Sequence, residues 1–141
     1  MTKTNPINPE TLNLKTYYKE LGQLLYAVAY SDGKVRQQEV DALREFVLKE
    51  LLPLEHSSDS SGMNKVFYTQ FEFDDFAKNQ QPFQLVFLNY IKYLKANSTY
   101  ITDNHKSSIL KAVEKVAGAY KNVNKKEEEL IETLKMELAK I

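Results

Sequence analysis

The chain has 141 residues, of which 43% are hydrophobic and 27% are charged, and its 19 basic and 19 acidic residues balance. This length and composition predict one globular domain with its own core. The zero net charge argues against general nucleic-acid affinity, and the lack of cysteine excludes disulfides, thiolate metal sites and cysteine nucleophiles. No apolar run resembles a signal peptide or a membrane span, so we expect a cytoplasmic protein with no transmembrane segment.

The N-terminal end predicts a short lead followed by a long helix. We expect residues 1–8 to be a disordered lead and residues 9–141 to form one helical domain. The Asn-Pro-Glu sequence at 8–10 combines an Asn cap, a Pro at the first helical position and an acid in the first turn, which predicts a helix over 9–31. Gly22 lies inside this helix and indicates a close approach of a second helix.

Residues 21–51 predict two helices joined by a tight turn at Asp32-Gly33. Apolar residues recur at helical spacing on both sides of this pair. We expect Gly33 to end the first helix at positive φ, because glycine tolerates that conformation. Glu39 falls in the first turn of the second helix, where a negative charge is favoured.

Further helices are predicted along the rest of the chain. The Ser-rich residues 55–64 are predicted to form a mobile connector. Residues 65–79 are expected to form short helices, since no second strand exists to pair with a strand there. Residues 82–97 are apolar on more than one face, so we expect the central, most buried helix there. With helices over 103–120 and from 124 onward, the prediction is an all-α, compact bundle of six to seven helices.

A weak internal repeat relates the two ends of the chain. Residues 21–46 align with 109–134, so that the apolar positions coincide and Glu39 matches Glu127. The Asp-Gly pair is not kept in the second copy. The alignment therefore predicts two related helical hairpins, with any role of Asp-Gly confined to the first.

The hairpin at 21–51 resembles the TerB-like family, helical modules named after tellurite-resistance proteins. The resemblance is carried by small and apolar residues before an Asp-Gly turn, an aliphatic residue after it and a Glu opening the next helix: Ala27-Val28-Ala29-Tyr30-Ser31-Asp32-Gly33-Lys34-Val35, then Glu39, Leu43 and Phe46. It implies two packed helical hairpins and a non-enzymatic interaction module. Such a module would act in a tellurite-resistance-type stress response or a membrane-associated one. Its partner would be an unidentified protein or a peripheral membrane-associated complex.

The alternative function is divalent-metal binding at Asp32 and Glu39. The Asp-Gly turn matches the second half of a calcium-binding EF-hand loop, but the first two ligand positions would hold Val28 and Tyr30. A calcium site needs six or more oxygen ligands, so this loop alone predicts weak binding. TerB-like proteins are associated with acidic residues and proposed metal binding, which keeps Asp32 and Glu39 as candidates for a weak site.

No residues of the sequence predict catalysis or a bound cofactor. Glu72, Asp74 and Asp75 form an acidic cluster that could do acid–base work, which would make the protein an enzyme. Neighbouring positions on a helix point in different directions, however, so a solvated face is the better interpretation. His56 and His105 have no further His or Cys at metal-ligand spacing. We therefore expect a protein that is not an enzyme.

Overall fold

The computed structural model describes residues 12–121 and 123–141, and the predicted N-terminal lead, residues 1–8, lies outside these ranges. The described part is all-helical, as predicted, with a single isolated bridge between Ser58 and Asn64 in place of any strand. Six α-helices make up the bundle: α1 (Leu14–Ala29), α2 (Gln37–Phe46), α3 (Phe67–Asn79), α4 (Phe83–Ala96), α5 (Asp103–Ala117) and α6 (Lys125–Ala139).

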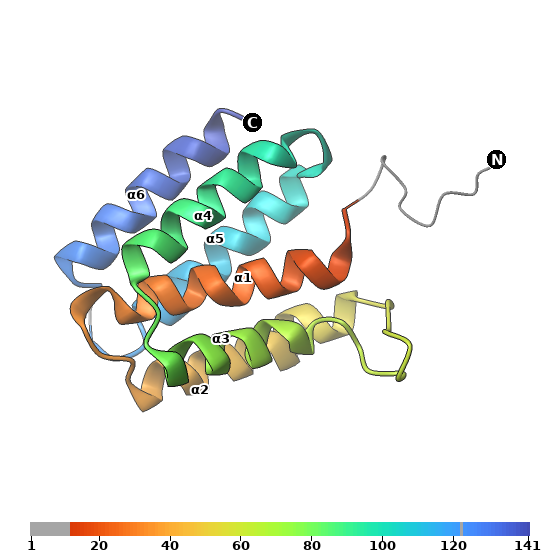
Figure 1. Ribbon diagram of the computed structural model, residues 1–141, viewed down its shortest axis with the longest axis horizontal. Helices are drawn as coiled ribbons and strands as arrows, with labels where there is room; N and C mark the ends of the chain where they lie inside the picture. Colours follow the sequence, from red (N-terminus) through yellow and green to blue (C-terminus); the bar gives the residue numbers. More distant parts are fainter. Residues whose placement is uncertain (1–11, 122) are drawn as a thin grey trace.

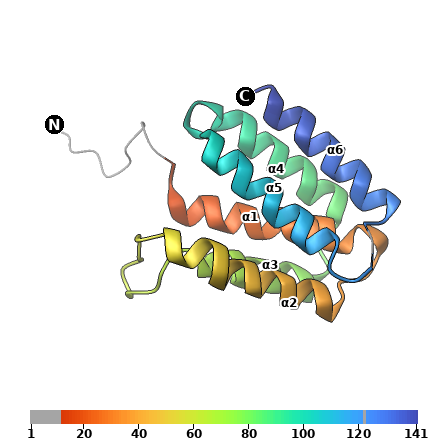
Figure 2. The same cartoon turned by 180° about the vertical axis from the view of Figure 1, so that it is seen from behind.

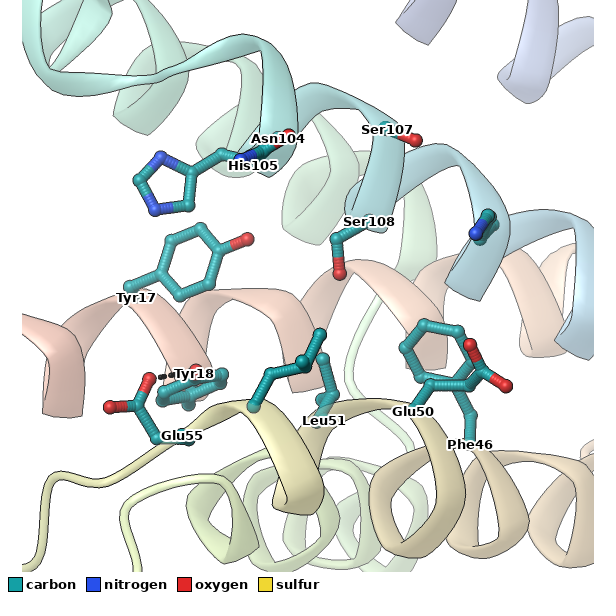
Figure 3. A pocket seen from close by; sticks show the side chains of 12 residues that line it. Tyr17, Tyr18, Phe46, Glu50, Leu51, Glu55, Asn104, His105, Ser107 and Ser108 are labelled. Carbon is teal, nitrogen blue, oxygen red and sulfur yellow. Dashed lines mark hydrogen bonds between the residues drawn. The ribbon is translucent and has the colours of Figure 1, made fainter.

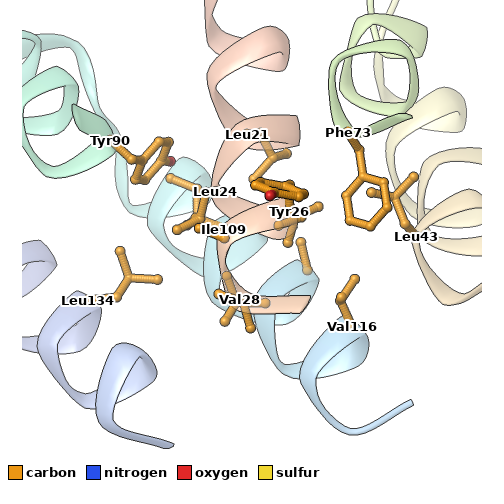
Figure 4. Close-up of a cluster of buried hydrophobic side chains, with 14 of the residues drawn as sticks. Leu21, Leu24, Tyr26, Val28, Leu43, Phe73, Tyr90, Ile109, Val116 and Leu134 are labelled. Carbon is orange, nitrogen blue, oxygen red and sulfur yellow. The ribbon is translucent and has the colours of Figure 1, made fainter. Parts of the chain in front are cut away.

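Helix α1 is the centre of the bundle. It lies between α2 and α3 on one side and α4, α5 and α6 on the other (Figures 1 and 2). It packs against α3, α4, α5 and α6. Its C-terminal half is buried on every face, because each residue from Leu24 to Ala29 has 0% exposure. Figure 4 shows α1 side chains such as Leu24 and Val28 meeting Ile109 of α5 and Leu134 of α6.

The prediction that residues 82–97 form the most buried helix is wrong. Helix α4 buries one face through Val86, Phe87 and Tyr90, but Leu85 and Leu88 are 56% and 57% exposed. The sequence argument counted large apolar side chains. The helix that is buried on all sides is instead α1, because its small residues let neighbouring helices approach closely.

Gly22 is where α3 approaches α1 most closely, as the sequence predicts. A Cβ atom added at Gly22 would lie 2.3 Å from the Thr69 carbonyl oxygen and 3.1 Å from the Glu72 Cβ. Real Cβ atoms are not found at the first of these distances, so only glycine permits this helix contact. Helix α1 begins later than predicted, since Asn13 caps it, accepting a 3.1 Å hydrogen bond from the Thr16 N–H. The predicted cap at Asn8 lies outside the described residues.

The Ser-rich connector between α2 and α3 is held by side-chain hydrogen bonds instead of being a loose link. The Asp59 carboxylate accepts hydrogen bonds from the Ser61 and Met63 N–H groups and from the Tyr68 hydroxyl. The Ser61 hydroxyl donates a further hydrogen bond, and this bond, followed by that of the Tyr68 hydroxyl, holds the pKa of Asp59 well below its usual range. The short helices predicted for residues 65–79 are one continuous helix, α3.

The turn after α1 forms as predicted. A 3-10 turn, η1 (Tyr30–Asp32), is closed by Gly33 at φ 92°, in the left-handed region. The described chain contains no helix with the length and hydrophobicity needed to cross a membrane.

Gly33→Ala is expected to lower the free energy of unfolding by about 1–2 kcal/mol, because an L-residue is strained at positive φ. Nothing lies within 4 Å of the added Cβ, so the loss would report backbone strain alone. Urea denaturation measures it, and Gly118→Ala is the matched control because Gly118 has an ordinary φ of −85°. Equal denaturation midpoints for the two variants would contradict the left-handed turn.

Candidate functional site

The first candidate site lies where the Asp32 turn meets the start of α6. Asp32 is held in place locally, accepting a 3.3 Å hydrogen bond from the Lys34 N–H and lying 3.6 Å from the Arg36 guanidinium. The Arg36 guanidinium carbon is also 3.9 Å from the centre of the Tyr120 ring. A small cavity of about 230 Å³ opens among these side chains. The guanidinium of Arg36, a side chain of the protein itself, therefore supplies the positive charge beside Asp32 in this cavity.

Two buried glutamates close the inner side of this cavity. Glu39 and Glu127 are each 2% exposed. The Glu39 carboxyl accepts a 2.7 Å hydrogen bond from the Arg36 N–H, and the Glu127 carboxyl accepts a 3.0 Å bond from the Asn124 N–H. Each glutamate thus completes the start of its own helix, α2 or α6. The two positions are equivalent in the predicted repeat, and the fold brings them together.

Burial and mutual proximity change the proton affinity of this pair. Burial raises the pKa of Glu39 to about 7, with the negative charges of Glu127 and Asp32 acting in the same direction. Burial likewise raises the pKa of Glu127, whereas a hydrogen bond from the Glu39 carboxyl lowers it. Both buried carboxyls therefore hold a proton more tightly than an exposed glutamate does.

Stability is expected to fall as the pH rises from about 4.5 to about 7, because the folded state binds the Glu39 proton more tightly than the unfolded chain does. This contribution is fully present below the unfolded pKa and is lost above the folded one. Urea denaturation at about pH 5 and about pH 8 measures the difference. Glu39→Gln should reduce this difference in stability between the two pH values. Glu128→Gln, a change at an exposed position of α6, should leave the difference unaltered. An equal loss in wild type and Glu39→Gln would rule out Glu39 as the source.

The structure places the two predicted metal candidates, Asp32 and Glu39, at one cavity but with different partners. Asp32 pairs with Arg36, and Glu39 pairs with a backbone N–H group and with Glu127. Among the residues that the structure describes, no three His, Cys, Asp or Glu side chains form a group able to hold a metal ion. The sequence argument missed Glu127 and Arg36. The internal repeat, which aligns Glu127 with Glu39, was the sequence signal that could have identified Glu127.

The acidic cluster on α3 is divided among three separate contacts. Glu72 accepts a 3.0 Å hydrogen bond from the Gln23 side chain, and Asp74 lies 3.3 Å from the Arg44 guanidinium. The Asp75 carboxylate accepts a 3.3 Å hydrogen bond from the Asn79 side chain, one turn further along α3. These carboxylates point towards different elements, as the helical geometry predicted.

The second candidate site is a groove of about 530 Å³ between the end of α2 and the start of α5. Tyr17 and Tyr18 of α1 and Phe46 of α2 form its floor (Figure 3). The two tyrosine rings pack edge to face with centres 5.1 Å apart. Beyond Phe46 the chain leaves the α-helical path for a π-helical turn, η2 (Val47–Leu51), and a 3-10 turn, η3 (Leu52–Leu54). We call this space the α2–α5 groove.

The walls of the α2–α5 groove carry polar groups. On the α2 side, Glu55 accepts a hydrogen bond from the Tyr18 hydroxyl, which raises the pKa of Tyr18 above its usual range after the larger effect of burial. On the α5 side, the His105 ring lies against Tyr17 with centres 5.1 Å apart. Burial lowers the pKa of His105, so its neutral form is favoured.

Hydrogen bonding orients the His105 ring in this wall. Its Nδ1 accepts a 3.0 Å hydrogen bond from the Thr102 N–H, so a neutral ring carries its proton on Nε2. The sequence identified His105 as an isolated surface residue and the tyrosines as packing residues. Their convergence depends on tertiary packing, which gave no local signal.

Comparisons of the chain with protein-family models, with curated proteins and with solved structures found no match. The fold and the two sites define a class: an all-helical bundle with a buried carboxyl pair between two hairpins and an open, partly apolar groove. The TerB-like resemblance remains an expectation from the sequence.

Proposed function

We propose that this protein is a non-enzymatic interaction module of the TerB-like kind, acting in a stress response of the tellurite-resistance type or in a membrane-associated response. The α2–α5 groove is the observation that supports the proposal most directly. Leu54 lines it with 80% of its surface exposed, above a floor that contains Phe46 and the buried Leu51. Exposed apolar surface beside a hollow is typical of a site where another molecule binds.

The distribution of titratable groups supports a binding role over a catalytic one. The α3 acids are engaged separately, with Asp74 on Arg44 and Glu72 on Gln23. The Glu39–Glu127 pair is engaged in completing helix starts. The α3 acids therefore offer no acid and base facing one shared open space, which general acid–base catalysis requires.

The test is affinity capture from an extract of the native host with the purified chain as bait. Leu54→Asp places a charge in the groove and is expected to abolish capture of the bound protein. Leu85→Asp is the matched control, since Leu85 is an exposed leucine on α4, which does not line the groove. Retention of the same proteins by both variants, or no protein captured by the wild type, would contradict the proposal.

Divalent-metal binding is the second candidate, because the fold adds Glu127 to the predicted Asp32 and Glu39 at the small cavity. The Arg36 guanidinium beside Asp32 opposes it, since a cation already compensates the charges there. We expect calcium to bind with a dissociation constant no tighter than about 10⁻⁴ M, because the carboxylates are too few and are already hydrogen-bonded. Isothermal titration of the metal-free protein measures this. A micromolar heat signal abolished by Asp32→Asn would favour the metal-binding function instead.

A further inference from the structure

The two walls of the α2–α5 groove carry opposite charge. Glu50 and Glu55 lie on the wall formed by the end of α2 and the turns that follow it. His105 and Lys111 lie on the wall formed by α5, where Ser107 and Ser108 add hydroxyl groups (Figure 3). One wall thus offers carboxylates, and the other offers an ammonium group and N–H and O–H donors.

The partial charge at the helix end on each wall has the same sign as the charged side chains of that wall. The α5 wall is the N-terminal half of a 15-residue helix, where unpaired N–H groups give a partial positive charge. The opposite wall follows the C-terminal end of α2, where carbonyl groups give a partial negative charge. The field across the groove therefore has a fixed direction.

Two charged side chains of the groove, Glu50 and Lys111, have no ion-pair partner within the described chain. One turn away from it, the same two elements are joined by the ion pair between Glu45 and Lys115. At the groove itself, Glu50 and Lys111 are exposed, and neither has an ion-pair partner among residues 12–121 and 123–141. A molecule between the walls could pair with both.

We propose that the α2–α5 groove binds an amphipathic helix of a protein partner, with basic residues along the flank that faces Glu50 and acidic residues along the flank that faces Lys111. The apolar stripe of this helix lies over Leu54, whose 80% exposed side chain a small zwitterion would leave uncovered. The inference rests on the proposed function and specifies the chemistry of the partner. Helix-in-groove recognition of this kind takes its affinity from the apolar stripe and its selectivity from the flanking charges.

Three synthetic helical peptides of equal length test the charge pattern. All share one leucine stripe: the first has lysine on one flank and glutamate on the other, the second has lysine on both flanks, and the third has glutamate on both. Binding is measured at low salt by fluorescence anisotropy, and the ¹H–¹⁵N spectrum of the protein locates the contact. Wild type is expected to prefer the mixed peptide by about two- to fivefold per mismatched flank, as exposed ion pairs provide.

Charge reversal in the protein provides the matched variants. Glu50→Lys makes both walls positive and should shift the preference to the all-glutamate peptide. Lys111→Glu makes both walls negative and should shift it to the all-lysine peptide. The double variant should prefer the mixed peptide again, bound in the reverse direction, because turning the helix round exchanges its flanks. Both positions are exposed and without an ion pair, so the variants are expected to keep the wild-type melting temperature.

A preference order that does not follow the wall charges, or peptide contacts outside the groove, would overturn this inference. So would a failure of all three peptides to bind. The proposed function is judged separately, by the capture experiment. If Leu54→Asp abolishes capture while the peptides show no charge order, only the charge pattern is wrong. If capture is independent of Leu54, the groove is not the interaction site.

Discussion

Gly22→Val is expected to give one of the two largest losses of stability among the substitutions considered for this protein. The new Cβ would meet the Thr69 carbonyl oxygen at 2.3 Å, and backbone on both sides of the contact leaves no flexible group to move away. Overpacking of a core contact commonly costs about 1–3 kcal/mol, and a clash with backbone belongs at or above the upper end of that range. Helix α3 would have to separate from α1.

Urea denaturation followed by circular dichroism measures the Gly22→Val effect. Gly118→Val is the control, because it introduces the same side chain at a position where a Cβ has only one near contact, 3.4 Å from the Glu114 carbonyl oxygen. Similar denaturation midpoints for wild type and Gly22→Val would show that α1 and α3 do not touch at this position.

Leu24→Ala is expected to lower the free energy of unfolding by about 2–5 kcal/mol, because it removes a side chain with 0% exposure and leaves a cavity. Leu88→Ala makes the same chemical change on a side chain that is 57% exposed. It should change stability by no more than about 0.5 kcal/mol. The pair distinguishes a bundle organised around α1 from one organised around α4, and a larger loss at Leu88 would favour α4.

Local signals in the sequence predicted the helices and the turn well. The Asp32-Gly33 turn and the start of α6 at Asn124 depend on a few neighbouring residues, so short patterns contain them. A glycine inside a helical pattern, as at Gly22, also indicated a close helix contact, although the sequence did not identify α3 as the partner. The start of α1 was misplaced because Asn8 and Asn13 both precede plausible helix starts. Asn13 is the one whose side chain forms the cap.

Features that depend on which elements meet could not be predicted in the same way. Identifying the central helix requires knowledge of what packs on each face, and the exposed leucines of α4 look the same in sequence as buried ones. The sequence identified Asp32 and Glu39 at the acidic turn. The third carboxyl of this site belongs to Glu127, which lies in α6 and is close to the turn only in the folded protein. The α2–α5 groove arises where η2 departs from regular α-helix, a change of path with no clear residue pattern.

The central position of α1 has a consequence for synthesis of the chain. Helix α1 leads the described helices, yet its packing partners extend to α5 and α6 at the far end. At about 5–20 residues per second, the ribosome needs roughly 4–18 s to go from Ala29 to Ala117. During that interval α3 and α4 can cover part of α1, but the apolar face that α5 and α6 cover in the folded domain has no partner. The nascent chain therefore presents its most aggregation-prone helix early, and its dependence on holding chaperones should be greatest before α5 emerges.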